Sequence, residues 1–143
     1  MALDFDEEIQ IPKPIHLGIL GSRDDLSQEK IVEEIITPVL SALGRLPERV
    51  ILPGDGRSSI FLLDWADQMK LPTTVYESDW YRHGRRARVF RDSRIEKEAT
   101  HFLVFLNKKS AYYEAVASRL ARKGATVYTV CFKTCELEEL TVS

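Results

Sequence analysis

Short apolar runs alternate along the chain with longer segments in which apolar residues recur every three or four positions. Such short runs are typical of buried β-strands, and the longer spacing is typical of amphipathic helices. The runs predict five strands, over residues 15–20, 49–52, 73–76, 101–106 and 125–130. Because strands that alternate with helices usually form a parallel sheet, the pattern predicts an α/β domain with a mainly parallel five-stranded sheet.

Helices are expected between these strands, over residues 27–43, 58–70, 89–98 and 111–123. Pro38 is expected to kink or interrupt the first helix because it has no backbone N–H, and Gly44 and Gly124 are expected to end the first and the last. We expect an N-terminal arm over residues 1–14, a single domain over 15–132 and an acidic C-terminal tail over 133–143. The tail is expected to form a short helix or to contact a partner.

Composition narrows the class of protein. The chain has 143 residues and a net charge of −2, so it is long enough for one domain and has no overall attraction to nucleic acid or an anionic membrane. Cys131 and Cys135 are expected to be reduced thiols, and no second pair completes a metal site. The acidic N-terminus does not resemble a secretory signal, and no apolar run has transmembrane length. We predict a cytoplasmic protein without metal, other cofactor or membrane partner.

Two turns after predicted strands have residues suited to an anion. Ligands of parallel sheets bind outside the carboxyl ends of the strands, so these turns are the first places to search. Gly21, Ser22 and Arg23 offer close backbone approach, a hydroxyl and a guanidinium fork. The second turn stands before a helix, whose N-terminal N–H groups favour a phosphate; its residues are Gly54, Asp55, Gly56, Arg57 and Ser58. The competing interpretation is that both are ordinary turns.

Residues 81–94 hold six arginines and one histidine in an otherwise slightly acidic chain. Arginine suits bidentate recognition of phosphate, so at least one is expected to contact a ligand. Arg91 and Arg94 lie three residues apart and share a helical face. Two alternatives remain open: a solvated basic surface, or a single-strand nucleic-acid surface on which Trp80, Tyr81 and Phe90 stack with bases.

Taken in order, these residues resemble the SLOG superfamily of Rossmann-like domains, which includes the Lonely Guy phosphoribohydrolases, DprA and small stand-alone YspA-like proteins. Residues 21–24 resemble the family's opening Gly-Ser-Arg-acidic turn, and residues 52–66 resemble its second strand and turn with an A-x-x-W-A helix. Trp80 with Gly84, followed by residues 91–94, resembles its W-x-x-x-G and R-N-x-x-M segment. The resemblance extends from about residue 15 to 130 and is closest to the YspA-like members.

The resemblance implies a three-layer sandwich with the first and fourth strands adjacent, a nucleotide-type ligand and a homodimer. Hydrolytic members have a glycine-rich loop after the fourth strand, whereas residues 106–114 here contain no glycine. Lys108, Lys109 and Ser110 stand there instead and are expected to contribute to ligand binding. Glu114 and Arg91 match the catalytic positions of the family.

Three functions follow as hypotheses. The first is binding of a nucleotide or ADP-ribose-like molecule by a sensor or sequestering module, with Trp80 stacking on the base; it is favoured by the missing glycines. The second is hydrolysis of a nucleoside 5′-monophosphate at its N-glycosidic bond, with Glu114 and Arg91 as catalytic residues. The third is single-stranded nucleic-acid binding, which the acidic composition disfavours.

Overall fold

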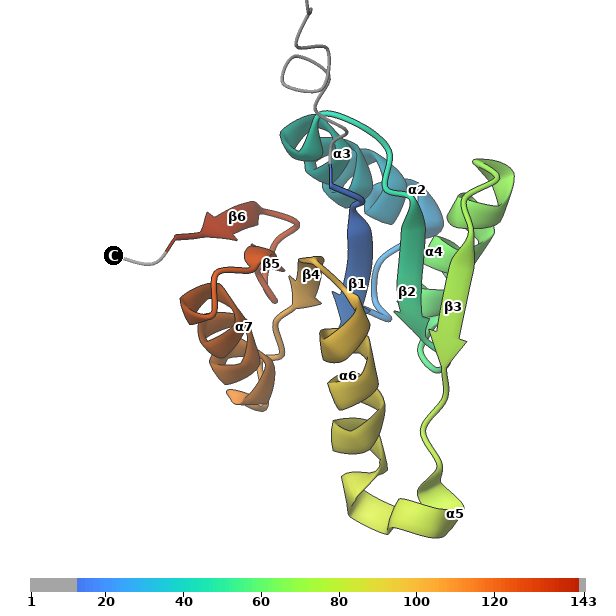
Figure 1. Cartoon of the computed structure of the whole chain (residues 1–143), viewed down its shortest axis with the longest axis vertical. Helices are drawn as coiled ribbons and strands as arrows, with labels where there is room; N and C mark the ends of the chain where they lie inside the picture. The colour runs from blue at the N-terminus through green and yellow to red at the C-terminus, as the bar shows by residue number, and fades with distance from the viewer. Residues whose placement is uncertain (1–12, 142–143) are drawn as a thin grey trace, which may run out of the picture.

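The computed structural model describes residues 13–141, which form a six-stranded sheet in the order β3-β2-β1-β4-β5-β6. The strands are β1 (His16–Leu20), β2 (Arg49–Pro53), β3 (Thr73–Tyr76), β4 (His101–Phe105), β5 (Thr126–Val130) and β6 (Leu137–Leu140). All neighbouring pairs are parallel except β5 and β6 (Figure 1). The strand order reverses direction between β1 and β4, where doubly wound sheets bind their ligands.

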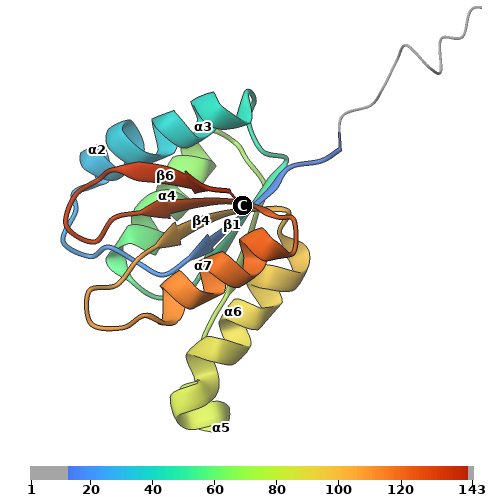
Figure 2. The ribbon, with the colours of Figure 1, turned by 90° about the vertical axis from the view of Figure 1, so that its left-hand side faces the viewer.

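Helices cover both faces of the sheet, which gives three layers (Figure 2). One face carries α2 (Gln28–Lys30), the π-helix η1 (Ile31–Ile36), α3 (Thr37–Leu43) and α4 (Arg57–Gln68). The other face carries α6 (Ala87–Glu98) and α7 (Tyr112–Arg122). Between β3 and α6 lie α5 (Trp80–His83) and the 3₁₀ turn η2 (Gly84–Arg86), which project beyond the sheet in Figures 1 and 2.

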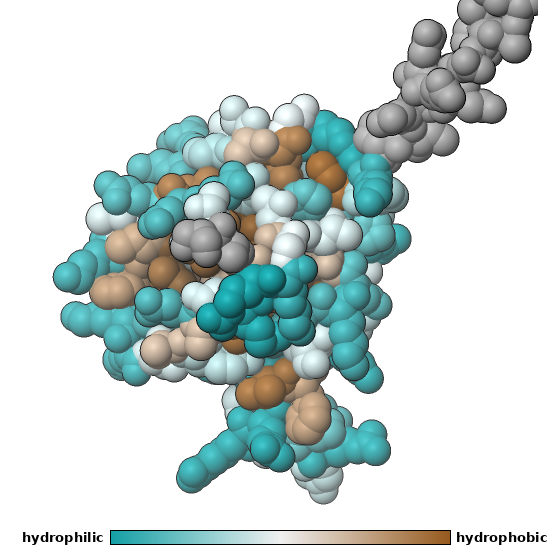
Figure 3. Space-filling model, turned by 60° about the vertical axis from the view of Figure 1, so that its left-hand side comes forward, coloured by the Kyte–Doolittle hydropathy of each residue, from teal (hydrophilic) through white to brown (hydrophobic). Residues whose placement is uncertain are grey.

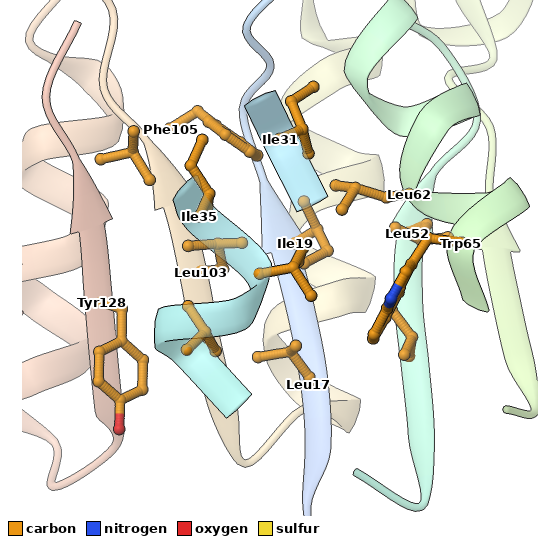
Figure 4. Close-up of a cluster of buried hydrophobic side chains, with 14 of the residues drawn as sticks. Leu17, Ile19, Ile31, Ile35, Leu52, Leu62, Trp65, Leu103, Phe105 and Tyr128 are labelled. Carbon is orange, nitrogen blue, oxygen red and sulfur yellow. The ribbon is translucent and has the colours of Figure 1, made fainter. Parts of the chain in front are cut away.

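The alternation of side chains along the strands builds two apolar layers, one on each face of the sheet. Leu17, Ile19 and Leu52 point toward η1 and α4 and are fully buried (Figure 4). Leu20 and Ile51 point the other way, into the layer under α6 and α7. Because both faces are covered, the central strands consist of nearly continuous apolar residues, which made them easy to predict.

Pro38 is accommodated by a widened turn. The backbone N–H and the hydroxyl of Thr37 both donate to the carbonyl of Val32, five residues earlier, the hydroxyl at 2.9 Å. Pro38 then falls in the first turn of α3, where a missing N–H costs little. The helical segment continues without a break from Gln28 to Leu43, so Pro38 changes the hydrogen-bond spacing before it and does not interrupt the helix as expected. Gly44 ends the segment at φ 80°, as expected.

The prediction of five strands is wrong, because residues 137–140 of the acidic tail form a sixth. This strand pairs antiparallel with β5, so the tail is not a short helix. The predicted neighbours β1 and β4 are confirmed. Most of the predicted N-terminal arm lies outside the described residues. Within residues 13–141, no helix combines the length and the apolar character needed to cross a membrane.

Candidate ligand-binding site

A polar cavity of about 230 Å³ lies at the carboxyl ends of β1, β2 and β4. The turn after β1 and the turn after β2 form two of its walls, and α6 and the start of α7 close it from the other face of the sheet. Its lining residues are Gly21, Ser22, Asp24, Pro53, Asp55, Gly56, Arg88, Arg91, Phe105, Asn107 and Tyr113. The cavity therefore occupies the position at which the strand order reverses.

Gly21 lets the turn after β1 pass directly over β4. Its φ is +77°, a conformation that side chains disfavour. A Cβ at this position would lie 2.4 Å from the carbonyl oxygen of Phe105, which is backbone and cannot rotate away. Glycine is thus required here both for conformation and for space, and it keeps the floor of the cavity open.

Arg91 forms the centre of a buried polar network beside the cavity. Its side chain is 4% exposed and donates to the fully buried carboxylate of Asp92, at 3.1 Å from Nε and 3.0 Å from the second terminal nitrogen. The other terminal nitrogen pairs with Asp55 and donates to the hydroxyl of Ser78 at 3.1 Å. The Tyr113 hydroxyl donates to Asp92 at 2.9 Å. Arg91 is therefore held rigidly, with its donors largely engaged inside the protein.

Burial and charge oppose each other in this network. Burial raises the pKa of Asp92, and the neighbouring Arg91 lowers it only in part, so the net direction is upward. Burial would lower the pKa of Arg91, but the carboxylates of Asp92 and Asp55 more than offset it, so that pKa is raised. Burial and Asp92 also raise the pKa of Tyr113, which stays a neutral hydrogen-bond donor. The network is an ion pair with a fixed hydroxyl partner.

The N-terminus of α4 is already occupied by a carboxylate of the chain itself. Oδ1 of Asp24 accepts from the backbone N–H of Arg57 at 2.7 Å and lies 3.5 Å from that of Ser58. The Ser58 hydroxyl accepts from the N–H of Arg23 at 3.0 Å and is buried. Sequence reasoning expected a phosphate on these N–H groups, but Asp24 takes that place and joins the two turns to each other.

Arg23 does not line the cavity, contrary to expectation. Its guanidinium is directed away, toward the loop between β5 and β6, where it donates to the carbonyls of Cys131 at 2.6 Å and Thr134 at 3.0 Å. It also pairs with the Asp25 carboxylate at 2.9 Å, and this hydrogen bond holds the pKa of Asp25 below its usual value. Arg23 thus attaches the sixth strand to the body of the domain.

Replacing Arg23 with methionine is expected to lower the free energy of unfolding by about 2 kcal/mol, because charged hydrogen bonds to the loop carbonyls are lost. Hydrogen exchange of the β6 amides should speed up more than that of the β1 amides. Denaturant unfolding measures the loss of free energy in Arg23→Met, and Arg57→Met is the control. Arg57 is exposed, and its side chain makes no ion pair within residues 13–141. Equal losses in the two variants would contradict this role of Arg23.

A more apolar pocket of about 340 Å³ adjoins the polar cavity. The two share Arg88, Asn107 and Tyr113 as lining residues. The second pocket is completed by Trp80, Arg85, Val89, Ser110 and Tyr112. Burial raises the pKa of Tyr112 to about 12, so its hydroxyl is neutral at physiological pH. A polar compartment and an aromatic compartment thus open onto each other, with Arg88 at their junction.

Arg88 differs from Arg91 in being exposed and in taking part in no ion pair within residues 13–141. It lies one helical turn before Arg91 and faces both compartments. Its guanidinium donors are consequently available to a ligand. Among the cavity-lining residues, Arg88 is the cation best able to bind an anion, because Arg91 is committed to Asp92 and Asp55.

Several predicted site residues lie elsewhere. Glu114 is exposed on α7 and lines none of the cavities described here, because its neighbour Tyr113 takes the inward position. Lys108 and Lys109 are exposed on the turn before α7 and line neither compartment. Arg94 stacks over the ring of Tyr76, 5.6 Å from its centroid, on the other side of α6. The predicted residues that do meet at the cavity are Gly21, Ser22, Asp55, Gly56 and Arg91, with Trp80 and Ser110 in the adjoining pocket.

Sequence reasoning missed Arg88, Asn107 and Tyr113 as individual site residues. The signal for Arg88 was its place three residues before Arg91, which puts both on one face of a helix. The signal for Asn107 was its position just beyond β4, at the same edge as the other two turns. Nothing local distinguished Tyr113 from Glu114, because the choice depends on the rotation of α7 against the sheet.

No family model, curated protein or solved structure matches this chain. The site therefore has to be interpreted from its own residues. Within residues 13–141, no three His, Cys, Asp or Glu side chains gather as a metal ion would require.

Proposed function

We propose that this protein binds a nucleotide or a nucleotide-derived, ADP-ribose-like small molecule at the carboxyl edge of its sheet, as a sensor or sequestering module. The observation that carries the proposal is the junction of a polar cavity with an aromatic pocket, with Arg88 facing both. A nucleotide likewise has a polar part and an aromatic part, since its phosphate and sugar are polar and its base is flat and apolar on both faces.

Arg88 is the proposed phosphate ligand. Its donors have no carboxylate partner within residues 13–141, and the guanidinium fork matches phosphate oxygens. The side-chain amide of Asn107 lines the same junction and can donate a further hydrogen bond. We therefore propose that the phosphate lies beside Arg88 and Asn107 rather than on the N-terminus of α4, which Asp24 already caps.

The sugar is proposed to lie deeper in the polar cavity. Asp24 and Asp55 are lining residues there, and carboxylates accept hydrogen bonds from sugar hydroxyls while repelling further phosphates. The base is proposed to stack in the adjoining pocket against Trp80 or Tyr112, where stacking is worth about 1–3 kcal/mol per base. The polar walls thus favour a ligand with one or two phosphates over a polyphosphate chain.

Binding without turnover is supported better than hydrolysis. The hydrolase hypothesis assigned the decisive carboxylate to Glu114, which is exposed and lies outside both compartments. The second catalytic residue of that hypothesis, Arg91, is paired with Asp92 and Asp55. Membership of the SLOG superfamily and pairing into a homodimer stay predictions from the sequence resemblance.

Arg88→Ala is expected to weaken binding of AMP or ADP-ribose about 10- to 100-fold, because a charge-assisted contact to phosphate is lost. Wild-type protein at a hundred times the Kd should gain about 10 °C in Tm, and the variant should gain far less. Arg122→Ala is the matched control, because Arg122 is an exposed arginine at the end of α7. If the ligand raised the Tm of Arg88→Ala as much as that of the wild type, the phosphate would bind elsewhere.

A further inference from the structure

A third hollow, of about 280 Å³, runs along the side of α6 that faces the β3–α5 connection. Arg82, Arg94 and Lys97 line it, together with the aromatic rings of His83 and Phe90 and two acidic residues, Glu77 and Asp79. These two rings pack at 4.4 Å between centroids. We call this hollow the α6 groove; of its lining residues, only Arg91 also lines the proposed ligand cavity.

The α6 groove is partly apolar and has more cations than carboxylates, because Arg82, Arg91, Arg94 and Lys97 line it against Glu77 and Asp79. None of its three exposed cations takes part in an ion pair within residues 13–141. Phe90 is 47% exposed, and the neighbouring Tyr81 is 103% exposed. Figure 3 shows this projecting part at the bottom of the view, mostly hydrophilic with a few apolar residues. Such a surface fits an extended segment that combines carboxylates with apolar side chains.

We propose that residues 1–12 of the same chain dock in the α6 groove. This segment has four acidic residues, Asp4, Asp6, Glu7 and Glu8, and no basic one, and they are interspersed with Leu3, Phe5, Ile9 and Ile11. Its carboxylates pair with the groove's cations, and an apolar side chain packs on the exposed rings. The acidic segment therefore complements the excess of cations in the groove, and both surfaces offer apolar side chains for packing.

The position of β1 makes this contact geometrically direct. The backbone N–H of Thr100, just after α6 ends, donates to the carbonyl of His16 at 2.9 Å, so the chain enters β1 beside the end of α6 that carries Lys97. From there α6 extends about 18 Å toward Arg82. Twelve extended residues span about 40 Å, which is enough to follow the whole groove.

Two other occupants fit less well. The acidic strand β6 offers charge only, because Leu137 and Leu140 already pack against the two core layers. A nucleic-acid strand would match the arginines and rings, but outside residues 80–97 the chain is acidic and repels a long polyanion. The N-terminal segment is also tethered, which raises its effective concentration at the groove.

Paramagnetic relaxation measured by NMR tests the proposal in the full chain. A nitroxide is attached to Ala2→Cys in a background of Cys131→Ser and Cys135→Ser, and amide intensities are read with the label oxidised and reduced. We expect amides between Arg82 and Lys97 to lose most of their intensity. The loss should shrink in high salt, which screens exposed ion pairs.

Charge exchange supplies the specificity test. Arg82→Glu with Lys97→Glu should abolish the intensity loss, and adding Asp6→Lys with Glu7→Lys should restore it, which also shows that the charge-reversed groove still folds. Arg122→Glu with Lys123→Glu, at the exposed end of α7, should leave the loss unchanged.

Two results would overturn the proposal. The first is no loss along α6 in the parent chain. The second is a loss of similar size in ¹⁵N chains that carry no nitroxide, when they are mixed with nitroxide-labelled chains at natural isotope abundance, which would assign the groove to a second copy. If there is no loss, chemical-shift changes of the groove amides on adding a short single-stranded oligonucleotide would assign the groove to nucleic acid.

Discussion

Arg91→Met is expected to lower the free energy of unfolding by about 3–5 kcal/mol, because it leaves the carboxylate of Asp92 buried without its cation. Asp92 is fully buried and receives two hydrogen bonds from Arg91, so only the Tyr113 hydroxyl would remain as a partner. Urea unfolding at neutral pH measures the loss. Arg94→Met, three residues later on the exposed surface, should cost no more than about 0.5 kcal/mol.

The same variant should respond to pH in a defined direction. Burial already raises the pKa of Asp92 in the folded protein, and replacing Arg91 removes the strongest influence that lowers it, leaving only the hydrogen bond from Tyr113 to do so. A carboxyl whose folded pKa lies above its unfolded value binds more protons when folded, so stability falls as pH rises through the folded pKa. Arg91→Met should therefore be less destabilised at acidic pH than at alkaline pH. A loss that is independent of pH would contradict a buried, uncompensated Asp92.

Gly21→Ala is expected to cost about 3 kcal/mol or more, through two effects at one position. The positive φ of +77° costs about 1–2 kcal/mol for any side chain, and the new Cβ would also meet the Phe105 carbonyl oxygen at 2.4 Å. Relieving that contact must separate the turn after β1 from β4, so the cavity should change shape as well. Nucleotide affinity should fall together with stability.

Gly44→Ala separates the two effects. Gly44 has nearly the same φ, +80°, but a Cβ there would meet no atom within 4 Å. Its loss, measured by the same denaturant unfolding, should be limited to the conformational cost of about 1–2 kcal/mol. If Gly21→Ala and Gly44→Ala lost the same free energy, the close approach of the first turn to β4 would be contradicted.

The central strands and the four long helical segments were predictable because each has a strong local pattern. β6 was not, because Glu138 and Glu139 stand side by side and break the alternation expected of a strand. This strand is instead held by backbone pairing with β5 and by Arg23, which lies 108 residues from Cys131 in the chain. A contact of that separation leaves no local signal.

The candidate site was predictable as a location but only in part as a set of residues. The rule that ligands bind at the carboxyl ends of parallel strands placed it at the correct turns. It did not reveal that Asp24 caps α4 across 33 residues, which excludes a phosphate from those N–H groups. Nor did it separate Tyr113 from Glu114, because one residue of a helix corresponds to a rotation of about 100°.

Titration of the ¹⁵N-labelled protein with AMP and with ADP-ribose, followed by amide and indole chemical shifts, tests the central claim most directly. Saturable shifts are predicted for Gly21, Ser22, Asn107 and the Trp80 indole, which surround the two compartments. They should be lost in Arg88→Ala and retained in Arg122→Ala. A folded protein whose spectrum responds to neither nucleotide, or responds only at residues away from the carboxyl edge of the sheet, would contradict the proposed function.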